Sequence, residues 1–242
     1  MRDDLEHASS APLTVQKWSF ALVCATAGAL AVPIHAVATP VSAAVAGLVG
    51  ILGLCAWRWS RLPSAMKADA PVGIDRLVNA AGSAGLGLVV GLLLLGLLRL
   101  VIEPAIPAIG SRLAAVALLP VWRRALVIFV AAVGEEVAFR LVLLSVVAGL
   151  TTRLLRLAGR IPTRRIVWAA NGVSAVAFAA VHLPAWSGAV PLSPGLMLAV
   201  LALNALGGVT FGYLFANRGI AAAMWAHTGA DCALQLIGPL TG

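Results

Sequence analysis

Long apolar runs separated by short charged segments set the pattern of this 242-residue chain. No Asp, Glu, Lys or Arg occurs in residues 18–38, 40–57 or 77–98, nor in the 52 residues from 166 to 217. Each shorter run is close to the roughly 20 residues that a helix needs to cross the hydrocarbon core of a bilayer. Such a span must be helical, because a lone segment in lipid has to satisfy its own backbone hydrogen bonds. The pattern therefore predicts an all-α, multi-pass transmembrane helical bundle.

The apolar runs predict about seven spans in a single membrane domain, 17–242, preceded by an N-terminal tail, 1–16. The expected spans are 18–38, 40–59, 77–100, 122–150, 166–184, 195–217 and 219–238. The segment 104–120 is apolar but short, and it contains Arg112 and three prolines. We expect this segment to form an interfacial or re-entrant helix.

Composition and charge agree with a membrane protein and predict its orientation. Only 11% of the residues are charged and 61% are hydrophobic, whereas a soluble domain carries about 25% charged residues. The net charge of +8 does not indicate a nucleic-acid partner, because the basic residues cluster in connections between spans. Twelve of the 17 Lys and Arg residues lie on the N-terminal side and four on the other side. Because positive connections stay inside, we expect a cell-membrane protein with a cytoplasmic N-terminus and an external C-terminus.

A few ionisable groups lie inside the predicted spans, away from their ends. The charged ones are Glu135, Glu136, Arg140 and Asp231. A charge at the bilayer centre costs at least about 2.5–3.5 kcal/mol, so intramembrane ionisable residues indicate a functional site. Glu136 and Arg140 are four residues apart and can neutralise one another on one helix face. Glu135 points about 100° away around the helix and is free of that pair.

Glu135, His182, His227 and Asp231 form a set with two chemical uses. They could bind a divalent metal such as zinc, which takes His nitrogen and carboxylate oxygen. They could instead activate water without a metal, with Glu135 as the general base. Each group alone also has a structural interpretation, such as a helix–helix hydrogen bond at a lone histidine. An intramembrane transporter or proton relay is the main alternative, although the chain has no internal repeat with matched broken helices.

Three short motifs follow one another on three of the predicted spans. Residues 135–140 read EExxxR, residues 178–182 read FxxxH, and residues 227–231 read HxxxD. Their order and spacing resemble the CPBP family of intramembrane endopeptidases. That family includes the type II CAAX prenyl endopeptidases and Abi-like bacterial relatives linked to bacteriocin processing or self-immunity. The resemblance places a CPBP-like catalytic core at about 122–238, and the high Ala and Arg content suggests a bacterial chain.

The resemblance implies an endopeptidase that cleaves a membrane-anchored peptide or protein. It implies that Glu135 and His182 activate the attacking water, while His227 and Asp231 steady the oxyanion or the site. An ionised Asp231 cannot donate a hydrogen bond, so it would orient His227, bind a metal or act protonated. A non-catalytic immunity or scaffold protein of the same fold is a further alternative. The implied supporting residues are Glu136, Arg140 and Phe178.

Helix geometry sets one condition on this site. At about 1.5 Å per residue, His182 lies roughly 25 Å from the cytoplasmic Arg165, and Glu135 lies roughly 16 Å from the external Arg124. In a hydrocarbon core of about 30 Å, Glu135 therefore lies roughly 10 Å nearer to the cytoplasmic side than His182. The two side chains can therefore meet only if a helix is strongly tilted, kinked or begins later than expected.

Overall fold

The structure is a computed structural model that describes residues 12–30, 39–62, 74–155, 162–187 and 191–241. These residues form helices and short connecting turns, with no strand among them, which confirms the predicted all-α fold. Most of the predicted tail 1–16 and the last part of the span 18–38 lie outside the described residues.

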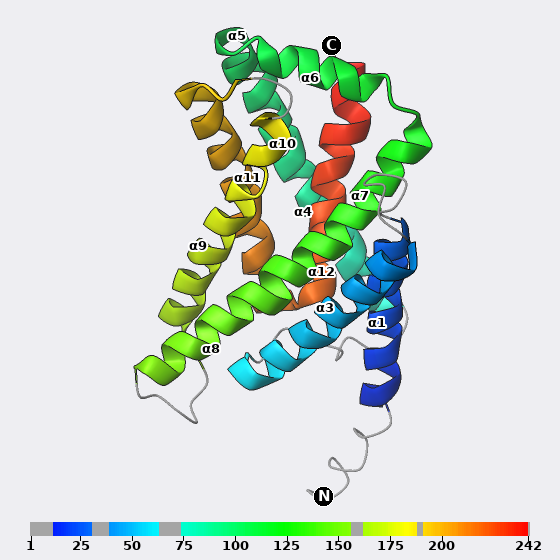
Figure 1. The fold of residues 1–242 in the computed structure, drawn as a ribbon, viewed down its shortest axis with the longest axis vertical. Helices are drawn as coiled ribbons and strands as arrows, with labels where there is room; N and C mark the ends of the chain where they lie inside the picture. Colours follow the sequence, from blue (N-terminus) through cyan, green and yellow to red (C-terminus); the bar gives the residue numbers. More distant parts are fainter. Residues whose placement is uncertain (1–11, 31–38, 63–73, 156–161, 188–190, 242) are drawn as a thin grey trace, which may run out of the picture.

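The helices follow one another along the chain and form one bundle (Figure 1). Their bounds are α1 Pro12–Leu30, α3 Thr39–Ser60, α4 Ile74–Leu97, η2 Leu98–Ile102, α5 Glu103–Ala105, α6 Ala108–Ala117, α7 Val121–Glu136, η3 Val137–Leu144, α8 Ser145–Leu154, α9 Arg164–Ala180, α10 Leu183–Ser187, α11 Pro194–Arg218, α12 Ile220–Cys232, η4 Ala233–Ile237 and η5 Gly238–Leu240. The segments η2, η3 and η4 are π-helical, and η5 is a 3₁₀ turn.

Four of the seven predicted spans coincide with helices that are long and apolar enough to cross a membrane. These helices are Pro40–Ser60, Leu77–Ala105, Arg164–Ser187 and Pro194–Arg218. The other three predicted spans overlap α1, the continuous rod formed by α7, η3 and α8, and the pair α12–η4. The chain is thus a multi-pass membrane protein, while the total of seven crossings stays a prediction.

The segment expected to be interfacial or re-entrant forms α6, which lies across one end of the bundle (Figure 1). Ile109 of α6 is 1% exposed and packs in an apolar cluster with Leu98, Leu196 and Val200. The C-terminus lies at this same end, whereas α3 and α8 finish near the opposite end, where α9 begins. The described helices α6 and α8 therefore mark opposite ends of the bundle, but the side of the membrane that each end faces stays a prediction.

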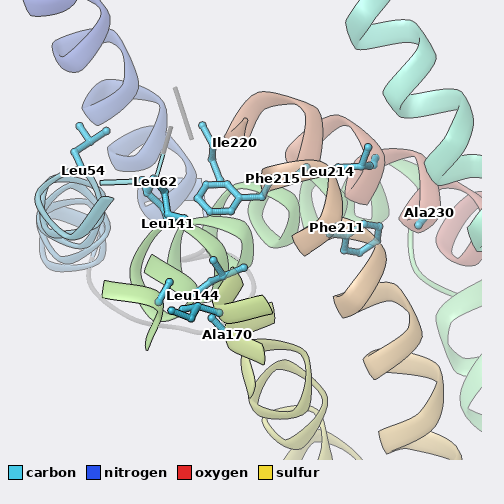
Figure 2. Packing of buried hydrophobic residues seen from close by; sticks show 14 residues of the cluster. Leu54, Leu62, Leu141, Leu144, Ala170, Phe211, Leu214, Phe215, Ile220 and Ala230 are labelled. Carbon is cyan, nitrogen blue, oxygen red and sulfur yellow. The ribbon is translucent and has the colours of Figure 1, made fainter. Parts of the chain in front are cut away.

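The rod formed by α7, η3 and α8 crosses the bundle diagonally, at a steep angle to α4 and α12 (Figure 1). The main apolar core lies around this rod, where Leu141 and Leu144 pack with Leu214 and Phe215 of α11 (Figure 2). All four side chains are at most 1% exposed. Because lipid is as apolar as leucine, close packing rather than exclusion from water holds such helices together.

Small residues let the helices that carry the site approach closely. A Cβ atom on Gly87 or Gly91 of α4 would overlap the α12 backbone at Ala226 or Ala230. A Cβ atom on Gly208 of α11 would lie only 3.0 Å from the backbone of Ala175 in α9. Small residues at helix interfaces are the usual means of bringing membrane helices into backbone contact. These contacts fix α12 against α4 and α11 against α9.

Candidate active site

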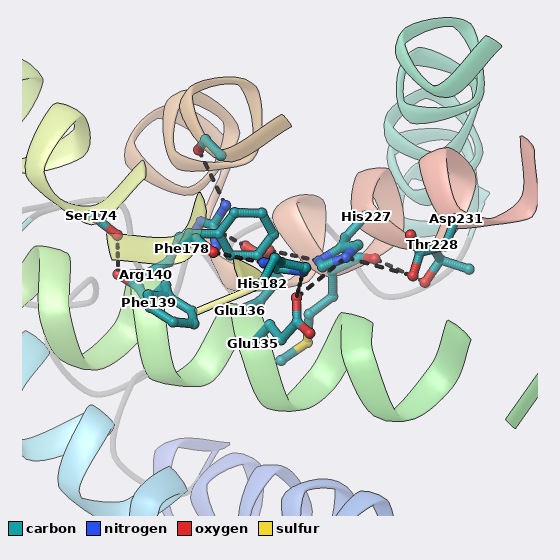
Figure 3. Close-up of polar contacts among 12 residues, drawn as sticks. Glu135, Glu136, Phe139, Arg140, Ser174, Phe178, His182, His227, Thr228 and Asp231 are labelled. Carbon is teal, nitrogen blue, oxygen red and sulfur yellow. Dashed lines mark hydrogen bonds and ion pairs between the residues drawn. The ribbon is translucent and has the colours of Figure 1, made fainter. Parts of the chain in front are cut away.

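The first motif lies where an α-helix changes into a π-helix. Glu135 and Glu136 end α7, and Arg140 lies in η3 (Figure 3). A π-helical turn shifts the backbone hydrogen bonds to the residue five positions back and often occurs at functional sites. Here the hydroxyl of Ser174 in α9 donates to the backbone oxygen of Phe139 over 2.6 Å. The neighbouring helix thereby helps to hold the π-helical segment.

His182 lies in the turn between α9 and α10, so the predicted span 166–184 is interrupted at this residue. Its Nδ1 is 2.7 Å from the backbone oxygen of Phe178. Because a carbonyl oxygen only accepts, we assign the proton of a neutral His182 to Nδ1. Its Nε2 then has a lone pair and lies 3.9 Å from Oε2 of Glu135.

His227 lies on α12 with a carboxylate near each of its ring nitrogens. Nδ1 is 2.9 Å from Oε1 of Glu136. Nε2 is 3.8 Å from Oε2 of Glu135 and 3.6 Å from Oδ2 of Asp231. The ring of Phe211 stacks on the imidazole with centroids 4.7 Å apart and planes 16° apart. The ring is therefore held both by a hydrogen bond and by an aromatic contact.

Glu136 connects His227 to Arg140. Oε2 of Glu136 is 3.1 Å from Nε of Arg140, and both side chains are almost completely buried. Nη2 of Arg140 also donates to the backbone oxygen of Gly208 over 3.2 Å. The guanidinium lies over the Phe178 ring, 4.5 Å from its centroid. The predicted Glu136–Arg140 pair is present, but the contact between Glu136 and His227 was not predicted.

The structure brings the four predicted site residues together around Glu135 (Figure 3). The side chains of Glu135 and His182 are 32% and 29% exposed, and that of Asp231 is 17% exposed. The side chain of Glu136 is 0% exposed. The two adjacent glutamates thus differ as predicted, with Glu135 facing an accessible space and Glu136 facing the interior. Glu135 and His182 meet at 3.9 Å, and α7 runs diagonally across the bundle (Figure 1).

A comparison with protein families gives the identity of this region. The model of the type II CAAX prenyl endopeptidase family, Rce1-like, matches residues 117–233, just under half of the chain. Residues 117–233 of this chain are therefore similar to that family. The matched segment contains all three motifs, and the suspected resemblance is confirmed. At the level of the family, an Rce1-like protein is an intramembrane CAAX-type endopeptidase, and hence a peptidase of the membrane. Comparisons with curated proteins and with solved structures found no match.

The arrangement of this site also bears on the alternative in which the four residues bind a metal ion such as zinc. A tetrahedral site needs nitrogen and oxygen donors that can all approach one ion to about 2.0–2.2 Å. Among the residues that the structure describes, no group of three or more His, Cys, Asp or Glu side chains is placed to hold a metal ion. The donor set is chemically suitable, but its present arrangement does not support a metal centre.

Proposed function

We propose that this protein cleaves a peptide bond in a membrane-anchored peptide or protein, using water activated by Glu135 and His182. One observation carries the proposal. Oε2 of Glu135 on α7 faces Nε2 of His182, in the turn after α9, at 3.9 Å and Nε2 of His227 on α12 at 3.8 Å. Ionisable groups that meet inside a membrane-spanning bundle are costly and are typical of a catalytic site.

The distance between Glu135 and His182 suits a shared water molecule. The Glu135 carboxylate and the unprotonated Nε2 of His182 are both acceptors, and 3.9 Å exceeds direct hydrogen-bond distance. A water between them can donate one proton to each acceptor. Its oxygen would then attack the scissile carbonyl while Glu135 takes the proton. When the carbon–nitrogen bond breaks, Glu135 gives this proton to the departing amine.

His227 would stabilise the charge that forms on the carbonyl oxygen, and the Asp231 carboxylate, 3.6 Å from its Nε2, would favour the protonated form of His227. With Nδ1 donating to Glu136, a second proton on Nε2 would make His227 a cationic donor beside two carboxylates. Such a donor stabilises an oxyanion far better in a dry site than in water. We assign Glu136 the role of orienting His227, as a buried carboxylate does in hydrolytic triads. Arg140 in turn neutralises Glu136.

An apolar cavity lined in part by α7 and α12, the helices that carry Glu135 and His227, supports a membrane-anchored substrate. Its volume is about 410 Å³, and it lies between α1, α7 and α12. Ala132 lines it one helical turn before Glu136, and Thr228, which follows His227, lines it from α12. The cavity can hold an aliphatic part of the substrate, because its wall is almost entirely carbon.

The proposal is tested with purified protein reconstituted into vesicles that carry a library of lipid-tethered peptides. Sequencing of released products would identify the bond that is cut. Glu135→Gln is the matched control, because it keeps the size of the side chain and removes the proton acceptor. We expect products from the wild type and none above background from the variant. Ion flux without peptide cleavage would instead support a transporter.

A further inference from the structure

The helix α6, which lies across one end of the bundle, contacts the segment that carries His182. We propose that Arg112 of α6 is a positioning residue that holds α10 and thereby fixes His182 for catalysis. Nη1 of Arg112 donates to the backbone oxygen of Ala185 over 2.6 Å. Its guanidinium also lies over the Trp186 ring, 4.4 Å from the centroid. Both contacts are with the five-residue helix α10.

The position of α10 controls that of His182 because the two are adjacent in the chain. α9 ends at Ala180, His182 lies in the following turn, and α10 begins at Leu183. The backbone N–H of His182 donates one hydrogen bond to the backbone oxygen of Ala179 in α9, over 3.2 Å. A movement of α10 would therefore shift the His182 backbone directly, and with it the Nε2 that faces Glu135.

Arg112 supplies a directional contact that the surrounding apolar packing does not. Leu183 and Trp186 of α10 pack against a cluster that contains Ile109 of α6. Apolar contacts tolerate sliding, whereas a charged hydrogen bond combined with a cation–π contact fixes distance and orientation. Arg112 itself lies outside the matched family segment, which begins at residue 117, whereas its partners Ala185 and Trp186 lie within it.

The effect of this contact should fall on the chemical step. A displacement of about 1 Å in a reacting group can reduce a rate by about 100-fold. The apolar cavity beside α12 lies on other helices, so substrate binding there should not depend on Arg112. We therefore expect Arg112→Ala to lower kcat by about 10- to 100-fold while KM changes little. Arg112→Lys keeps a cation over Trp186 and one donor, so it should recover most of the loss.

The experiment uses the full-length protein in vesicles and has two readouts. The first is hydrogen–deuterium exchange of the backbone amides in residues 181–187, which requires no activity. The second is kcat and KM on a tethered peptide, which rests on the proposed function. Arg123→Ala, at the start of α7, is the matched control. We expect faster exchange in 181–187 for Arg112→Ala than for Arg123→Ala, together with the loss of kcat.

Several outcomes would overturn this role of Arg112. The first is equal hydrogen–deuterium exchange of residues 181–187 in Arg112→Ala and Arg123→Ala. The second is an effect of Arg112→Ala on KM but not on kcat. The third is a kcat of Arg112→Lys as low as that of Arg112→Ala. If Arg112→Ala does not accumulate, Trp186→Leu removes the other half of the contact and should give the same exchange and kcat. If the wild type cleaves no peptide, the proposed function fails, while the exchange experiment still decides whether Arg112 holds α10.

Discussion

The buried carboxylate of Glu136 has two charged or polar partners, and its replacement should expose both of its roles. Oε2 is 3.1 Å from Nε of Arg140, and Oε1 is 2.9 Å from Nδ1 of His227. Glu136→Gln keeps the shape of the side chain but leaves Arg140 without a countercharge in the bundle interior. Removing one partner of a buried pair costs about 3–5 kcal/mol. Total stabilities are about 5–15 kcal/mol, so we expect a clear loss of stability.

A second substitution separates the two roles. Glu136→Gln combined with Arg140→Met leaves no unpaired charge, so the double variant should recover much of the stability. It should not recover activity, because Gln can present its amide to Nδ1 of His227 and favour the wrong tautomer. A comparable change in a hydrolytic triad lowers kcat by about 10⁴-fold. We expect a loss of about 10²-fold or more in the double variant.

The measurements are thermal unfolding in detergent micelles and cleavage of a tethered peptide by the folded fraction. Folded protein is separated by size exclusion, so that a low yield is not mistaken for a low kcat. Recovery of both stability and activity in the double variant would show that Glu136 serves only to pair with Arg140. A single Glu136→Gln variant as stable as the wild type would refute the argument about the buried pair.

Three further predictions concern the base, the metal and the topology. Glu135→Gln should lower kcat by about 10²–10⁴-fold with an unchanged unfolding temperature, since its side chain is 32% exposed and outside the buried pair; a near-normal cleavage rate would exclude Glu135 as the base. Chelators should leave cleavage unchanged, because no three donors in the described part of the chain are placed around one ion; loss of activity restored by added zinc would contradict this. Reporter fusions after residue 156 and at the C-terminus should read cytoplasmic and external, and identical readings would refute the seven-span topology, which places three spans between these two sites.

The positions of the site residues could be predicted because the membrane makes ionisable groups rare. Glu135, His182, His227 and Asp231 stood out against uncharged spans, and the structure brings them together. The different directions of Glu135 and Glu136 followed from helical periodicity alone. The separate short helix α6 could be predicted because the segment 104–120 is apolar but short and contains three prolines.

Other features left no signal in the sequence. The contact between Glu136 and His227 joins residues 91 positions apart, and the spacing to Arg140 already accounted for the charge of Glu136. The π-helical segment η3 contains no Pro or Gly that would mark it. The tilt of α7 depends on packing against neighbouring helices, which no single segment encodes. The sequence indicates only that Arg112 disfavours a membrane span in 104–120. Its contacts with Ala185 and Trp186 could not be predicted, because these residues lie far along the chain.

The central claim is that water held by Glu135 and His182 attacks the peptide bond. It is tested most directly by cleaving a tethered peptide in water enriched in ¹⁸O and analysing the new carboxyl terminus by mass spectrometry. We expect the wild type to incorporate one ¹⁸O atom per cleavage, and the folded Glu135→Gln variant to release no product above background. Undiminished cleavage with ¹⁸O incorporation by Glu135→Gln, or no cleavage by the wild type, would contradict the account.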